Sequence, residues 1–259
     1  MPGEALGLTN ISVRFGGLQA LSEVTCRMAS ETLTGVIGPN GAGKTTLLNV
    51  ISGLVPATGR VQLGNQVISG LPAHKRPRLG LARTFQSLEL APDDTLAANV
   101  AVGGTIQRRC ATAWTFFGDL RGRREERHVR HEVLGLLELL GIAEWSEVRM
   151  RSIPYVIQKR AQIARALMLH PKVLLLDEPA SGMSPTEKLE LREVLSTLSR
   201  EKRLTMVVIE HDIGFLTGCC ENLVALNFGK VIAQGSAQDV VANQKVIDSY
   251  LGTTKAATA

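Results

Sequence analysis

The chain has 259 residues, of which 44% are hydrophobic and 20% charged, a balance typical of a globular domain that buries a core. No apolar run approaches the roughly 18 residues of a membrane-spanning helix, and a basic start with a hydrophobic signal core is missing, so we expect a cytosolic protein. The four cysteines lack CxxC spacing, which indicates small apolar residues in a reducing compartment rather than a disulfide framework or a metal site.

The net charge of +5 is concentrated in one segment. Between Gln107 and His131 there are seven arginines against three acidic residues. Such a basic segment could bind nucleic acid, an anionic membrane surface or an acidic partner subunit. A solvated helical face is the remaining interpretation.

The first third of the chain alternates strand and helix patterns, which favours an α/β core. A helix is predicted from Lys44 to Ile51, ending at Gly53, and Gly64-Asn65 is typical of a hairpin turn. The predicted strands are Leu6–Phe15, Leu21–Met28, Thr32–Ile37, Val61–Leu63, Gln66–Ile68 and Leu81–Phe85.

From about Gln86 to Leu169 the apolar spacing becomes helical, which indicates a helical subdomain inserted into the core. One predicted helix ends at Gly141 and has an apolar face of Val129, Val133, Leu136, Leu137 and Leu140. The elements predicted after it are the strand Val173–Leu176, the helix Pro185–Arg200, the strand Thr205–Ile209, two strands near 223–227 and 230–233, and a frayed tail at Thr253–Ala259.

Residues 38–46 read Gly-Pro-Asn-Gly-Ala-Gly-Lys-Thr-Thr and follow an apolar strand, which predicts a phosphate-binding loop. Glycines let the backbone curl, so that its N–H groups and the start of the next helix face an anion. Lys44 adds a charge for the β- and γ-phosphates, and the Thr45 hydroxyl can bind Mg²⁺. The predicted loop ligands are Gly38, Pro39, Asn40, Gly41, Ala42, Gly43, Lys44, Thr45 and Thr46. The alternative is a chance glycine-rich turn, which the residues downstream oppose.

Two carboxylates follow the apolar strand Val173–Leu176. Asp177 is expected at the carboxyl edge of the sheet, where it can hold Mg²⁺ directly or through water. Glu178 can orient and deprotonate a water that attacks the γ-phosphate. The next strand brings His211 to the same edge, where its imidazole can hydrogen-bond the phosphate and the water; a structural histidine is the alternative.

These motifs occur in the order found in ATP-binding-cassette (ABC) ATPases, a family that the chain resembles over nearly its whole length. The resemblance depends on Gly38–Thr46, Gln86 after Arg83-Thr84-Phe85, Leu176-Asp177-Glu178-Pro179 and Glu210-His211-Asp212. Further details resemble the longer ATPase subunit of branched-chain amino-acid importers. They are Arg14–Gly17, Leu81–Gln86, Pro179–Pro185, the basic insertion after Gly104 and the ending Val246–Gly252.

The resemblance implies a P-loop NTPase core with an antiparallel β subdomain and an inserted helical subdomain. One domain is expected over 1–252, with the core at about 1–86 and 171–252, the helical subdomain at about 87–170 and a tail at 253–259. The implied ligands are ATP and Mg²⁺. Phe15 would stack on adenine, unless it is an ordinary strand aromatic. Gln86 would join Mg²⁺ and the attacking water to a transmembrane subunit, and Ala180–Pro185 would contact a second ATPase subunit.

The implied function is an ATPase at the cytoplasmic face of the plasma membrane that drives transmembrane permease subunits. Import of branched-chain or other amino acids, or of urea and short amides, follows from the resemblance, with a periplasmic-type binding protein as an indirect partner. A regulator that binds ATP with little hydrolysis is an alternative, although Glu178 and His211 oppose it. A nucleic-acid-associated ABC protein fits poorly, because the chain has one cassette and no heptad run, so no nucleic-acid partner is expected.

One departure from the family concerns the signature loop, commonly Leu-Ser-Gly-Gly-Gln, which serves the ATP bound to the opposite subunit. This chain reads Ile-Pro-Tyr-Val-Ile-Gln at 153–158, before a helix expected from about Gln158 to Leu169. Val156 replaces a glycine, and a β-branched side chain resists both positive φ and close approach to a phosphate. We therefore expect a heterodimer with one weak site; the alternative is that a small backbone shift accommodates Val156.

Overall fold

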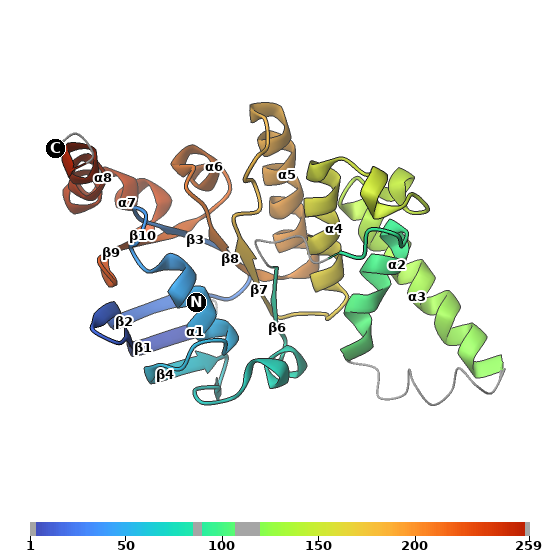
Figure 1. Cartoon of the computed structure of the whole chain (residues 1–259), viewed down its shortest axis with the longest axis horizontal. Helices are drawn as coiled ribbons and strands as arrows, with labels where there is room; N and C mark the ends of the chain where they lie inside the picture. The colour runs from blue at the N-terminus through green and yellow to red at the C-terminus, as the bar shows by residue number, and fades with distance from the viewer. Residues whose placement is uncertain (1–3, 85–89, 107–119, 257–259) are drawn as a thin grey trace.

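The structure is a computed structural model that describes residues 4–84, 90–106 and 120–256. Its first sheet is antiparallel, with strands in the order β2-β1-β4-β5 (Figure 1). Its strands are β1 (Glu4–Phe15), β2 (Leu18–Ala29), β4 (Thr58–Leu63) and β5 (Gln66–Val67). On β2, Val24, Cys26 and Met28 are buried and alternate with exposed residues, so one face of this sheet is buried in the core and the other is exposed.

The second sheet has six strands in the order β10-β9-β3-β8-β7-β6. They are β3 (Leu33–Ile37), β6 (Leu81–Arg83), β7 (Val173–Asp177), β8 (Thr205–Ile209), β9 (Asn222–Asn227) and β10 (Lys230–Ser236). All neighbours pair in parallel except β9 and β10. Every residue of β3, β7 and β8 is buried, because both faces of the sheet are covered, which explains why these strands are mostly apolar.

Helix α1 (Lys44–Ser52) lies between the two sheets (Figure 1). Its Leu47 and Leu48 share a core with Leu8 of β1 and Leu175 of β7. The buried Arg76 donates hydrogen bonds to the carbonyls of Val50 and Ile51 and so satisfies the last turn of α1. The helix is therefore fixed at its C-terminal end, while its N-terminus meets the loop that precedes it.

Helices cover the other face of the large sheet. They are α4 (Tyr155–Leu167), α5 (Pro185–Lys202), α6 (Ile213–Thr217), α7 (Ala237–Ala242) and α8 (Gln244–Ala256). Ser184 and Glu187 form a capping box at the start of α5, and Leu191, Leu195 and Leu198 face the core, as an i, i+4, i+7 pattern requires.

Between β6 and β7 the described residues form helices, at the right of Figure 1. They are α2 (Leu96–Ala101), α3 (Leu120–Leu139) and α4, together with the 3₁₀ turns η3 (Val102–Ile106), η4 (Ala143–Trp145) and η5 (Met150–Ser152); η1 (Ala73–Lys75) and η2 (Pro77–Leu79) precede β6. The expected buried face of α3 is present at Val133, Leu136 and Leu137, and Gly141 follows with φ +66°. The described residues hold no helix that combines the length and apolarity needed to cross a membrane.

Among the boundaries that differ from the sequence prediction, three concern the segments around the site and the C-terminus. Helix α4 begins at Tyr155 rather than Gln158, because Pro154 has the fixed φ that suits a helix start and its carbonyl accepts from Gln158 N–H. Strand β6 is described to Arg83, and the expected Phe85 lies outside the described residues. The expected tail from Thr253 is part of α8 as far as Ala256.

Candidate active site

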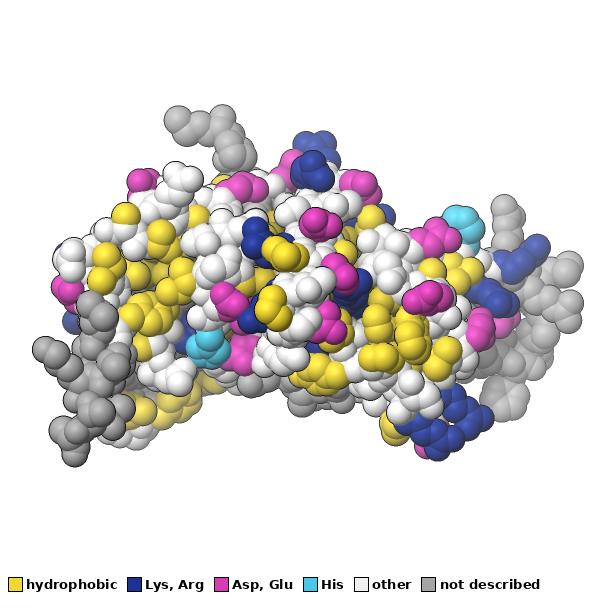
Figure 2. All heavy atoms as spheres, turned by 90° about the horizontal axis from the view of Figure 1, so that it is seen from above, with side chains coloured by type: hydrophobic (Ala, Val, Ile, Leu, Met, Phe, Trp, Pro, Cys, Tyr) yellow, Lys and Arg dark blue, Asp and Glu magenta, His cyan; other side chains and the backbone are white. Residues whose placement is uncertain are grey.

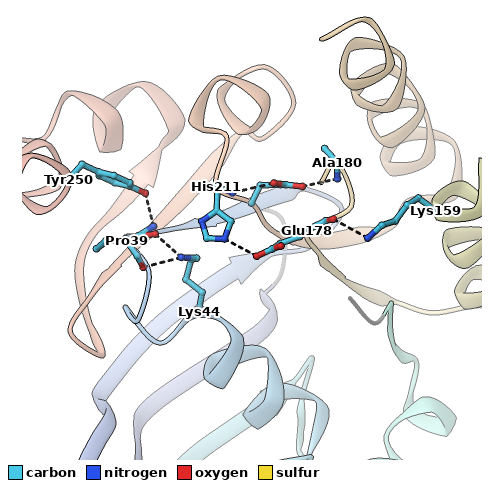
Figure 3. A network of polar contacts seen from close by, with 9 residues as sticks. Pro39, Lys44, Lys159, Glu178, Ala180, His211 and Tyr250 are labelled. Carbon is cyan, nitrogen blue, oxygen red and sulfur yellow. Dashed lines mark hydrogen bonds and ion pairs between the residues drawn. The ribbon is translucent and has the colours of Figure 1, made fainter. Parts of the chain in front are cut away.

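The parallel strands β3, β8 and β7 are neighbours in the sheet, so their carboxyl ends lie along one edge. The phosphate loop follows β3, Asp177 ends β7, and Glu210 and His211 follow β8. Figure 3 shows Lys44, Glu178 and His211 converging at this edge from different elements. The sheet therefore collects residues that are more than 130 positions apart in the sequence, such as Lys44 and Glu178.

The loop from Gly38 to Thr46 is curled as a phosphate cradle requires. Gly41 has φ +78° and Gly43 has φ +101°, a backbone region that side chains rarely adopt. A Cβ at Gly43 would lie 2.8 Å from the Ala20 carbonyl oxygen, and one at Gly38 would collide with that of Leu226. Helix α1 starts at Lys44, so its N-terminal dipole faces the loop.

The Lys44 ammonium is buried inside this loop. Its Nζ donates to the carbonyl oxygens of Gly38, at 2.6 Å, and Pro39, at 3.1 Å. Burial lowers the pKa of Lys44, and the nearby Glu178 carboxylate opposes that shift. The loop thus closes around a desolvated cation, an arrangement that an anion stabilises.

Glu178 and His211 are in direct contact. His211 Nε2 lies 2.7 Å from Glu178 Oε1, with the histidine side chain half exposed and the glutamate mostly buried. Glu178 has φ +48°, and both its peptide groups are bonded: its N–H donates to Ile209 O, and its carbonyl accepts from Lys159 Nζ at 3.4 Å. The strained backbone is therefore held from β8 and from α4.

Asp177 is paired with Arg83. The sequence analysis included Arg83 in a family motif but gave it no role. Arg83 Nη2 lies 2.8 Å from Asp177 Oδ2, and both side chains are under one-tenth exposed. Arg83 also donates to Asn49 and Ser52 of α1. The available signal was a basic residue at the end of β6, the strand beside β7.

Glu210 is a second residue that sequence reasoning left without a role. Its buried carboxylate accepts the N–H of Ala180 at 2.7 Å and the N–H of His211 at 3.2 Å. Burial raises its pKa, and the two N–H donors partly oppose that shift. Glu210 therefore fixes His211 and the start of the Ala180–Pro185 loop, and the signal was a carboxylate that ends a wholly apolar strand.

The remaining predicted ligands differ in exposure. Asn40 and Thr45 are exposed, Thr46 and Pro39 are partly buried, and Ala42 is buried. Phe15 is half exposed at the corner between β1 and β2. Gln86 lies outside the described residues. Among the described residues, no cluster of three or more His, Cys, Asp or Glu could hold a metal by itself.

Val156 lies in the first turn of α4 and is partly buried. It is not among the residues with positive φ, because Pro154 starts a regular helix that includes Val156. The Tyr155 ring lies close to Gly182, so the predicted signature loop touches the Ala180–Pro185 loop of its own chain.

The basic segment is described in part, because 107–119 lie outside the described residues. Within α3, Arg130 lies 3.4 Å from Glu147 in an exposed ion pair. Figure 2 shows acidic and basic side chains intermixed on the described part of one face.

Comparison with known proteins identifies the family. A family model described as ABC transporter matches residues 21–181, and a Branched-chain amino acid ATP-binding cassette transporter model matches 230–256. BraF of Pseudomonas aeruginosa, a high-affinity branched-chain amino acid transport ATP-binding protein, is 34% identical over 95% of this chain and 97% of BraF. LivG of Escherichia coli K12, with the same description, is 33% identical over 95% of this chain and 97% of LivG. The chain belongs to the ATP-binding subunits of ABC transporters.

Solved structures of ATP-binding cassettes have the same fold as this chain. A nucleotide-free ATP-binding cassette from an ABC transporter has a TM-score of 0.83 and 28% identity, covering 95% of this chain and 98% of that one. The ADP conformation of MJ1267, an ATP-binding cassette of an ABC transporter, has a TM-score of 0.83 and 29% identity, covering 96% and 99%. The ABC ATPase fold predicted from the sequence is confirmed, and the protein is a transport-coupled ATPase of a nucleotide-binding family.

Replacing Arg83 by Met leaves Asp177 as a buried charge without its guanidinium partner. We expect the free energy of unfolding to fall by about 3 kcal/mol, measured by urea denaturation without nucleotide. Adding Asp177→Asn should recover part of this loss. Arg151→Met is the matched control, because its pair with Asp93 is exposed and is worth under about 1 kcal/mol. Equal losses in the two single variants would contradict a structural role for the Arg83–Asp177 pair.

Glu210→Gln should change how stability depends on pH. Because burial raises the folded-state pKa of Glu210 above its ordinary 4.5, the stability it contributes is fully present below that value and is lost as pH rises through the folded-state pKa. The difference in unfolding free energy, wild type minus Glu210→Gln, should therefore fall from acid to neutral pH in urea titrations. Glu193→Gln, an exposed position on α5, should show no such trend. A difference that grows with pH would show that the burial argument is wrong.

Proposed function

We propose that this ABC cassette binds MgATP at the edge formed by β3, β7 and β8 and hydrolyses it there. The observation that carries the proposal is the buried Lys44 ammonium beside the Glu178–His211 pair. The cation suits a polyanion, and the carboxylate–imidazole pair suits activation of water next to it. The edge also supplies the N–H groups of a curled loop and a helix N-terminus.

Each predicted residue receives a role in this proposal. Gly38–Thr46 bind the phosphates, with Lys44 as the charged ligand, and Phe15 stacks on the adenine. Glu178 takes the proton of the attacking water, while His211, 2.7 Å away, holds the carboxylate in position. Gln86 connects the site to the transmembrane subunit.

The residues present fit Mg²⁺. Mg²⁺ takes hard oxygen ligands and is held by one or two protein groups together with phosphate oxygens, which agrees with Thr45 and Asp177 as donors. One Asp177 oxygen already binds Arg83, so we propose that Asp177 acts through its other oxygen or a water. When bound, the ion neutralises charge on the transferred phosphoryl group.

We propose branched-chain amino acids as the substrate class, because BraF and LivG are named for that transport and cover nearly the whole chain. The partners are transmembrane permease subunits, a second ATPase subunit and, indirectly, a periplasmic-type binding protein; the location is the cytoplasmic face of the membrane. The core at 1–86 and 171–252 would hold the nucleotide, and the helical subdomain at 87–170 would face the permease. Nucleic acid has no role in this proposal.

The pair of ATPase subunits is proposed to be asymmetric. The side chains that serve this chain's own nucleotide are present, whereas Val156 puts a β-branched residue in the first turn of α4, whose N-terminus would face the partner's ATP. ATP on this chain would turn over, and ATP on the partner would turn over poorly. A heterodimer whose partner has an intact signature loop makes one strong and one weak site.

Glu178→Gln should trap the closed ATP-bound pair, since the amide accepts hydrogen bonds but cannot take the proton from water. Loss of a general base typically costs about 10²–10⁴-fold at the affected site. Because the partner's weak site still turns over, we expect turnover of the assembled transporter to fall by at least about tenfold. Turnover is measured by phosphate release, and closure by the nucleotide retained in gel filtration. Lys44→Ala should retain no nucleotide, and Glu193→Gln should behave as wild type. Wild-type turnover in Glu178→Gln would overturn the role of Glu178.

Val156→Gly should raise turnover of the assembled transporter about twofold, since backbone N–H groups of α4 could then approach the partner's γ-phosphate and a second site would join the first. Val156→Ala is the matched variant, because it removes the branched side chain and keeps helix propensity. We expect it to give a smaller gain. If neither variant turns over faster than wild type in phosphate-release assays, the asymmetry is wrong.

A further inference from the structure

The C-terminal helix contacts the phosphate loop through one hydroxyl group. Tyr250 lies on α8, 212 positions after Gly38, and its hydroxyl oxygen accepts the Gly38 N–H at 2.8 Å. Figure 3 shows the Tyr250 ring directed at the start of the loop, opposite Lys44. The ring packs against the core on the α7 side of the large sheet, and burial raises the pKa of the hydroxyl, so the group is neutral at physiological pH.

The bond falls on a peptide that determines the shape of the loop. The N–H of Gly38 is held by Tyr250, and its carbonyl accepts from Lys44 Nζ at 2.6 Å. Pro39 follows and has no N–H of its own. The backbone of Gly38 also packs so closely on Leu226 of β9 that a Cβ would collide there. The first turn of the loop is therefore fixed by these two hydrogen bonds and by close packing against β9.

We infer that Tyr250 is a positioning residue of the nucleotide site, whose hydroxyl holds the first peptide of the phosphate loop in the conformation that binds the phosphates. This inference rests on the proposed function above. It makes nucleotide affinity dependent on α8, a helix that contributes no predicted ligand. The residues matched by the branched-chain family model, 230–256, include Tyr250.

The physical reason is preorganisation. If the loop leaves the binding conformation for part of the time, the apparent affinity falls by the fraction of molecules that remain competent. Loss of a neutral hydrogen bond to a buried N–H changes the equilibrium constant between the two loop conformations a few-fold. Tyr250 meets the loop on the side away from Glu178, the proposed general base (Figure 3), so its loss should weaken binding and leave the chemical step nearly unchanged.

The test compares Tyr250→Phe, which keeps the ring and removes the hydroxyl, with Ser249→Ala. Ser249 is the neighbouring residue on α8, and its hydroxyl bonds within the helix to Val246 O. In Tyr250→Phe we expect faster hydrogen exchange of the Gly38 amide and an MgADP dissociation constant about fivefold higher by calorimetry. At saturating ATP, the turnover of the assembled transporter should stay within about twofold of wild type. Ser249→Ala should match wild type in all three measurements.

The outcomes separate this inference from the proposal on which it rests. Failure of the wild-type protein to bind MgADP would remove the proposed nucleotide site itself. Tight MgADP binding by Tyr250→Phe, with unchanged Gly38 exchange, would overturn the positioning role alone. Weaker binding with unchanged Gly38 exchange would also overturn it, because the effect would not pass through the loop. Equal effects in Ser249→Ala would assign the change to α8 as a whole.

Discussion

The ammonium group of Lys44 is enclosed by the loop that precedes its own helix, and a buried cation requires oxygen atoms around it. In the structure those atoms are the carbonyl oxygens of Gly38 and Pro39. Because carbonyls solvate the charge without neutralising it, the loop keeps a net attraction for an anion. The geometry of the site depends on this requirement: the glycines that curl the loop, and the strand before it, hold carbonyl oxygens around the cation.

A second requirement concerns the three carboxylates near this cation. They carry like charges, so each needs a hydrogen-bond donor that holds it in position. Each acidic residue has its own donor. Asp177 pairs with Arg83, Glu178 with His211, and Glu210 with two backbone N–H groups. These donors come from β6, from the residues after β8 and from the Ala180 loop, so neutralising the charges also connects the segments around the site. Burial of Arg83 and Glu210 makes these connections strong, because water cannot replace either partner at low cost.

Much of the fold was predictable because buried parallel strands read as unbroken apolar runs, as in Thr205–Ile209, which is β8 to the residue. The phosphate loop was predictable because its glycines and Lys44 are contiguous. Tyr250 was not, because its partner lies 212 positions away and an aromatic residue on an amphipathic helix indicates packing. Arg83 lacked a role for the same reason: its partner belongs to a strand whose neighbour becomes known only from sheet order. The start of α4 was misplaced because a glycine requirement was carried over to a position where Pro154 starts a helix.

In the arrangement proposed above, Tyr250 and Val156 would act on different nucleotides, and the sheet explains why. Tyr250 reaches Gly38 from the β9 side, so it bears on the triphosphate that this chain holds. Val156 lies at the N-terminus of α4, and the Tyr155 ring and Lys159 connect this helix to Gly182 and to the Glu178 carbonyl. The signature helix therefore contacts the backbone of the proposed catalytic residue in its own chain, and in the proposed pair it would also face the partner's phosphate. A change at the partner's site could therefore affect Glu178 through α4 and the hydrogen bond from Lys159. A change in α8 would affect the phosphate loop through Tyr250, without involving α4. The two sites of a pair can thus be coupled through α4, and the affinity of each can be set separately through its own C-terminal helix.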